Sequence, residues 1–146
     1  TNFPEIDYDS MLQSLTVLMH TSIISQMSFQ ATYESSEVAR LAVDIASDKQ
    51  ASEIAMLDIK DVSDFADYFV VLTVNSPRQL SSLSDDIEDA LGAQGAVLHH
   101  REGTSGDGWV LLDFIDVIVH LFRPEEREFY GIEDAWSSGL ETVRIQ

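Results

Sequence analysis

The chain has 146 residues, of which 45% are hydrophobic, and therefore fits one domain of ordinary size with an adequate core. Its 26 acidic and 8 basic residues give a formal charge of -18, which disfavours direct binding to nucleic acid or to a membrane and suits either a basic protein partner or simple solubility. The absence of cysteine excludes disulfides, thiolate zinc sites and cysteine nucleophiles.

The first 27 residues are the least domain-like part of the chain. Acidic residues at the start are followed by an apolar stretch from Met11 to Ile24 without a clear helical register. We interpret residues 1–27 as an N-terminal extension and residues 28–146 as the folded domain; a helix used for self-association, which would make a homodimer, is the alternative. The first 26 residues contain no Lys or Arg, so a targeting segment is not expected, and no apolar run is long enough to span a bilayer.

Helical and strand-like patterns then alternate. Apolar residues at helical spacing predict a helix from an N-cap at Ser35 or Ser36 to about Lys49, followed by a strand at residues 54–59. The continuous apolar character of residues 68–74 predicts a second strand, buried on both faces.

A second helix is expected to begin at Ser76 and Pro77, because Ser is a good N-cap and Pro suits the first helical position. It should end at Gly92 or Gly95, and a third strand should cover residues 96–101. This helix is long enough for a right-handed crossover that joins the second and third strands as parallel neighbours.

Residues 109–122 are strand-like throughout but too long for one ordinary strand. A break between Asp113 and Asp116 would divide them into two strands joined by a tight turn. Pro124 should then open a short helix that Gly131 closes. The order of elements predicts an α/β fold: a single domain with a mixed β-sheet of about five strands flanked by helices.

No catalytic or metal-binding motif stands out. His99 and His100 are adjacent on an expected strand and point to opposite faces, so a histidine metal site is not expected. Asp113 and Asp116 could form a magnesium pair only if a turn brings them together. We therefore expect no metal, no cofactor and no enzymatic activity.

Two tryptophans suggest a protein-binding surface. Trp109 opens a strand directly after the glycine-rich segment 103–108, and Trp136 follows an expected helix end. A rigid aromatic side chain beside acidic residues is typical of a binding hot spot, although ordinary core burial explains either residue alone.

The C-terminal part of the chain resembles the signature of the ribosomal silencing factor (RsfS/Iojap) family. The resemblance lies in the run Trp109 to Phe122, continued by Arg127, Phe129-Tyr130, Glu133 and Trp136. An upstream block is similar to the strand, loop and helix of that family: Asp58-Ile59, Ser63, residues 65–71, Asn75-Ser76 and Arg78-Gln79. With residues 37–49 resembling its first helix, the similarity extends over about residues 36–136.

The resemblance implies a regulator of translation that is not an enzyme. Members of this family bind protein uL14 of the large ribosomal subunit and sterically block association of the two subunits. It also implies a nucleotidyltransferase-like topology without the catalytic signature of those enzymes. The expected localisation is the bacterial cytoplasm.

The same resemblance suggests which residues contact uL14. The interface candidates are Trp109, Leu111, Asp113, Phe114, His120, Phe122 and Tyr130. Trp109 would serve as the apolar anchor and Asp113 as the hydrogen-bond acceptor. Because side chains alternate along a strand, the candidates divide between two faces, and His120 and Phe122 are expected to be core. The chain departs from the family at Ile115 and near Val74, where glycine is usual, so the turn could differ locally.

Two rival functions remain open at this point. A nucleotidyltransferase-like, metal-dependent enzyme would need clustered carboxylates in a cleft. An acidic scaffold for another basic protein would differ only in the partner it captures.

Overall fold

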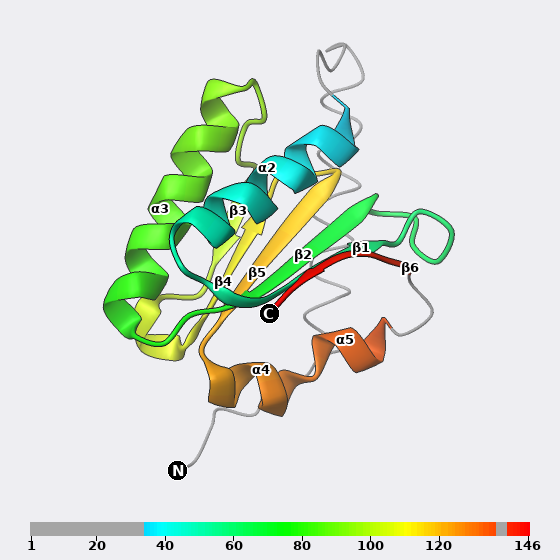
Figure 1. Cartoon of the computed structure of the whole chain (residues 1–146). Coiled ribbons are helices and arrows are strands. Elements are labelled where there is room, and N and C mark those ends of the chain that lie inside the picture. The colour runs from blue at the N-terminus through cyan, green and yellow to red at the C-terminus, as the bar shows by residue number, and fades with distance from the viewer. Residues whose placement is uncertain (1–33, 137–139) are drawn as a thin grey trace. The chain divides into compact units, whose positions relative to one another are not determined.

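The computed structural model describes residues 34–136 and 140–146, which belong to one compact unit, Ala31–Gln146. The proposed extension at residues 1–27 lies outside the described residues and stays a prediction. The described part is an α/β fold, as predicted, with helices packed on a mixed sheet (Figure 1).

Helices and strands follow one another along the chain with short connections. In chain order they are α2 (Ser35–Asp48), β1 (Ser52–Asp58), β2 (Tyr68–Thr73), α3 (Pro77–Ala93), β3 (His100–Glu102), the 3-10 turn η1 (Ser105–Asp107), β4 (Trp109–Asp113), β5 (Val117–Phe122), α4 (Pro124–Tyr130), α5 (Ile132–Ala135) and β6 (Leu140–Ile145). The strands form one sheet in the order β3-β4-β5-β2-β1-β6.

The sheet differs from the prediction in two respects. It has six strands rather than about five, because β6 pairs antiparallel with β1 at the edge. The strands joined through α3 are not neighbours: β2 pairs in parallel with β5, and β3 lies at the far edge beside β4. The expected β2–β3 parallel pair was therefore wrong, because the chain passes through β3 and the β4–β5 hairpin before it returns to β2.

One face of the sheet is covered by α2 and α3, which lie side by side across it in Figure 1. Alternate residues of the strands point into this core, among them Ile54, Met56, Val70, Leu72 and Val119. The apolar faces of the helices meet them with Val38, Ala42, Leu80, Leu83, Ile87 and Leu91. Each such buried Leu or Ile contributes about 1.5–3 kcal/mol, which is what holds the helices on the sheet.

The predicted N-cap of α3 is correct, and the predicted N-cap of α2 is wrong. Ser76 caps α3 as expected, since its hydroxyl accepts the backbone N–H of Gln79 at 3.1 Å. The N-cap of α2 is Glu34 rather than Ser35 or Ser36. The Ser35 hydroxyl instead donates to Asp67 Oδ2 at 2.7 Å, a contact between residues far apart in sequence that ties the start of α2 to the end of the β1–β2 loop.

Candidate functional site

The sheet face opposite α2 and α3 carries most of the residues expected to bind a partner. Strand register places Trp109 of β4 opposite Phe122 of β5, and Leu111 opposite His120. Asp113 follows on the same face because side chains two apart on a strand point the same way. The break predicted between Asp113 and Asp116 is confirmed, and it is what folds β4 back onto β5.

Aromatic rings form a continuous band across this face, which we call the aromatic cluster. Its members are Phe65, Phe69, Trp109, His120, Phe122, Tyr130 and Trp136. Neighbouring centroids lie 5.0 Å apart for Phe69 and His120 and 6.0 Å apart for His120 and Phe122, whose rings are stacked. Each such pair contributes about 0.5–1.5 kcal/mol beyond its buried area, so the cluster is rigid as well as apolar.

The cluster is closed at one end by α4, which follows β5 directly. Tyr130, the last residue of α4, packs on Trp109 at a centroid distance of 5.9 Å, and Gly131 ends the helix with a φ of +55°. Gly108 allows this approach, because a Cβ at that position would lie 2.3 Å from Glu126 of α4. The glycine before Trp109 thus sets the contact between β4 and α4, a role that the sequence pattern did not reveal.

Several polar atoms in the cluster are buried without a hydrogen-bond partner among the residues that the structure describes. They include both ring nitrogens of His120 and the indole Nε1 atoms of Trp109 and Trp136. Burial lowers the pKa of His120 to about 3, so its ring is neutral at physiological pH. Buried polar atoms without a partner are costly in a folded protein, so the packing of the surrounding rings must offset this cost.

The turn between β4 and β5 is organised by Asp113. Its Oδ1 accepts the backbone N–H of Ile115 at 2.7 Å, and Ile115 has a φ of +76°, a region that β-branched residues rarely occupy. Burial raises the pKa of Asp113 above its ordinary value, and the Ile115 hydrogen bond acts in the opposite direction. Burial also raises the pKa of Asp116, together with the negative charge of Asp67.

The structure therefore unites six of the seven interface candidates and separates one. Phe114 lies in the core beneath α2 and α3, on the other side of the sheet. All seven are buried, with Trp109 at 7% and Tyr130 at 8% the most exposed, whereas neighbouring Phe129 is 50% exposed. Phe65 and Phe69 were not among the predicted site residues, because their positions beside Trp136 and His120 depend on the parallel pairing of β2 with β5.

Groups suited to other functions are sparse in residues 34–136 and 140–146. These residues contain no group of three or more His, Asp or Glu side chains arranged to hold a metal ion. They also contain no helix long and apolar enough to cross a membrane. The best-developed feature is instead the aromatic cluster, a rigid layer of rings on the sheet face opposite α2 and α3 of an α/β protein.

Comparison with known proteins assigns the family. The model of the family described as "Ribosomal silencing factor during starvation" matches residues 32–146. The chain belongs to this family, a family of regulatory proteins, and the resemblance found in the sequence is confirmed.

Several curated relatives carry the same description. The chain is 36% identical over 113 residues to ribosomal silencing factor RsfS of Zymomonas mobilis, covering 77% of this chain and 85% of the relative. It is 34% identical over 99 residues to RsfS of Bacillus subtilis, covering 68% and 84%. A chloroplast protein of Arabidopsis thaliana, Iojap, is 31% identical over 66% of this chain and 40% of its own length.

Solved structures confirm the α/β fold class. A crystal structure of a Chromobacterium violaceum protein superposes with a TM-score of 0.69 at 29% identity, covering 77% of this chain and 92% of that one. A Bacillus halodurans protein gives a TM-score of 0.63 at 32% identity, covering 70% and 95%.

Proposed function

We propose that this protein binds uL14 on the large ribosomal subunit and sterically prevents the small subunit from joining. Membership of the ribosomal silencing factor family supports the proposal. The protein would act by occupying a surface, which needs no reactive group. Such a role places it in a compartment that contains ribosomes, and for relatives of this kind in bacteria that is the cytoplasm.

The observation that carries the proposal is the aromatic cluster, which places Trp109 and Tyr130 together at its α4 end. Large aromatic side chains dominate the energetics of protein interfaces, and indole and phenol groups supply both apolar area and a polar contact. In this protein Trp109 and Tyr130 lie side by side at the α4 end of the cluster, next to the half-exposed ring of Phe129.

The buried positions of the seven candidates suggest a division of roles. We expect Trp109 and Tyr130 to touch uL14, since both retain some exposure at the edge of the cluster. Leu111, His120 and Phe122 have none and would hold these rings from beneath. Asp113 would fix the turn through Ile115, and Phe114 would anchor that turn in the core on the other face.

The acidity of the chain supports a basic partner. With a formal charge of -18, the protein would be attracted to basic ribosomal proteins and repelled by exposed rRNA, so contact through a protein is favoured over contact through nucleic acid.

Replacing Trp109 with alanine tests the proposal. We expect Trp109→Ala to weaken binding to purified large subunits, and to isolated uL14, by at least about 2 kcal/mol, a typical loss for an aromatic hot spot. Binding is measured by co-sedimentation and by titration calorimetry.

Leu112→Ala is the matched control. Leu112 lies on the same strand as Trp109 but points into the core under α2 and α3, so its truncation destabilises the fold without altering the aromatic cluster. Folded Leu112→Ala protein should bind large subunits like the wild type. Equal losses in the two variants, or wild-type binding by folded Trp109→Ala, would contradict the proposed site.

A further inference from the structure

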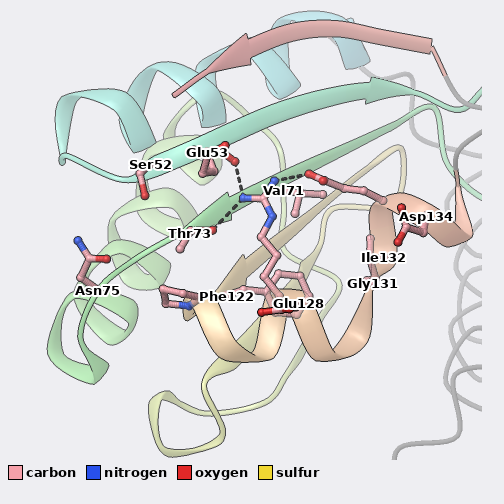
Figure 2. A pocket seen from close by; sticks show the side chains of 13 residues that line it. Ser52, Glu53, Val71, Thr73, Asn75, Phe122, Glu128, Gly131, Ile132 and Asp134 are labelled. Atoms are coloured by element: carbon pink, nitrogen blue, oxygen red, sulfur yellow. Dashed lines mark hydrogen bonds and ion pairs between the residues drawn. The ribbon is translucent and has the colours of Figure 1, made fainter.

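A recess opens beside the aromatic cluster, where the beginning of β1 and the end of β2 face α4 and α5. Its volume is about 470 Å³. Figure 2 shows Glu53, Val71 and Thr73 on the strand side of the opening and Glu128, Ile132 and Asp134 on the helix side. We call this recess the α4–α5 pocket. It is large enough for one or two long side chains of another protein.

The floor of the pocket is apolar and continuous with the aromatic cluster. Val71, Phe122 and Ile132 line it, and none of them is more than 2% exposed. Phe122 also stacks with Trp109 at a centroid distance of 6.4 Å, so one ring belongs to both sites. A partner held on the aromatic cluster would therefore lie next to the pocket.

Among the described residues that line the pocket, Arg127 is the one basic side chain, and it is already hydrogen-bonded. Its guanidinium donates to the backbone carbonyl of Glu53, to Thr73 Oγ1 at 2.8 Å and to the carboxylate of Glu133. These bonds hold α4 and α5 against the strands, and they occupy three of the five N–H groups of Arg127.

The pocket is lined by more carboxylates than the single positive charge of Arg127 can neutralise. Glu133 pairs with Arg127, and Glu53 lies 3.6 Å from the guanidinium of Arg144. Glu128 and Asp134 are exposed at the mouth and form no ion pair with a described residue. An apolar floor beneath two unbalanced carboxylates fits a side chain with an aliphatic stem and a cationic end.

We propose that the α4–α5 pocket receives a lysine or arginine side chain of the protein bound at the aromatic cluster. The stem would enter the opening between the strands and α5, and the cation would approach Glu128 and Asp134 at its mouth. This inference rests on the proposed function, because it takes the partner to be a basic protein. It adds a second, electrostatic contact that fixes the orientation of the partner.

Arginine analogues test the pocket directly. Full-length protein with labelled methyl groups is titrated with N-acetylarginine methylamide and, separately, with the citrulline analogue, which has the same shape without the charge. The arginine probe should shift the methyl resonances of Val71 and Ile132 with an affinity in the range of about 1–10 mM, and the citrulline probe should not. The double variant Glu128→Gln/Asp134→Asn should lose the response. No shift, or equal shifts with both probes, would overturn the inference.

Binding to the large subunit tests whether the pocket serves the partner. Glu128→Gln/Asp134→Asn should weaken co-sedimentation about two- to tenfold. The control Asp44→Asn/Asp89→Asn removes the same charge from exposed positions on α2 and α3, and should change binding less than about twofold. Equal losses in the two double variants would overturn the inference, because they would reflect total charge alone. Failure of wild-type protein to bind large subunits would instead overturn the proposed function, and the arginine titration would still decide the chemistry of the pocket.

Discussion

His120 is a buried base that the fold keeps neutral. It lies between Phe69 and Phe122, fully buried, and both ring nitrogens lack a partner among the described residues. Burial lowers its pKa from 6.5 to about 3. Between these two pH values the unfolded chain binds a proton at this residue and the folded chain does not, so acidification favours unfolding by up to about 1.4 kcal/mol per pH unit.

Replacing His120 with phenylalanine should remove this proton-linked loss of stability. As the pH falls from about 7 to about 5, the free energy of unfolding of the wild type should decrease more steeply than that of His120→Phe. Asp113 and Asp116, whose pKa values are raised, act in the opposite sense above their ordinary pKa, but they are common to both proteins and cancel in the difference. Urea denaturation at several pH values measures, for each protein, the slope of the free energy of unfolding against pH. Identical slopes would contradict a buried neutral His120.

Ile115 is a strained residue in an otherwise well-bonded turn. A positive φ of 76° places its Cβ close to the following carbonyl, which costs a non-glycine residue about 1–2 kcal/mol. The hydrogen bond from its N–H to Asp113 and the bond from Phe114 N–H to the carbonyl of Val117 at 2.9 Å hold the turn in place.

Ile115→Gly should relieve that strain. We expect the free energy of unfolding to rise by about 0.5–1 kcal/mol, because the relief exceeds the added flexibility of the unfolded chain. Ile115→Ala, which keeps the Cβ, should show no such gain. Thermal and urea denaturation of the three proteins provide the comparison, and a glycine variant less stable than the wild type would show that the Ile115 side chain contributes more by packing than it costs in strain.

At the scale of elements, Arg127 is the residue that joins α4 and α5 to the sheet. Its guanidinium contacts β1 through Glu53, β2 through Thr73 and α5 through Glu133. Glu53 lies at a bulge in β1 with a φ of +49°, and its carbonyl is available to Arg127 for that reason.

Arg127→Lys should weaken the attachment of α4 and α5 to the sheet even though the positive charge is kept. An ammonium group cannot reach three acceptors on different elements, so we expect a loss of about 2 kcal/mol in unfolding free energy and faster amide exchange in α4 and α5. Arg101→Lys is the control, since Arg101 bonds Asp85 and Glu88 at a more exposed position. A loss no larger in Arg127→Lys than in Arg101→Lys would contradict the anchoring role.

Local signals in the sequence predicted most of the helices and strands, but they did not predict which strands pair with one another. Ser76 and Pro77 predicted the start of α3 correctly, and the length of the apolar run around Asp113 predicted the β4–β5 hairpin. The edge strand β6 was missed because Glu141 and Arg144 interrupt its apolar pattern. The start of α2 was misplaced because Ser35 bonds Asp67, a tertiary contact with no local signature.

The candidate site was predictable to a similar extent. The alternation of side chains correctly indicated two faces for the residues from Trp109 to Phe122. It did not indicate that Phe69 lies against His120, since that contact requires β2 to pair in parallel with β5. The expectation that His120 and Phe122 are core agrees with their full burial, although they lie on the same face as Trp109.

At the scale of the whole molecule, the two faces of the sheet have different tasks. One face packs against α2 and α3, and the other carries the aromatic cluster, which adjoins the α4–α5 pocket. A formal charge of -18 surrounds both, which would speed encounter with a basic protein and slow encounter with exposed RNA. Under the proposed function, the protein would silence a ribosome by occupying a surface that the small subunit needs.

Light scattering during subunit joining tests that claim most directly. Large subunits incubated with this protein should fail to join small subunits, excess small subunit should restore joining by competition, and Trp109→Ala protein should leave joining unaffected. Normal joining by large subunits that visibly carry the bound wild-type protein would contradict silencing by occlusion.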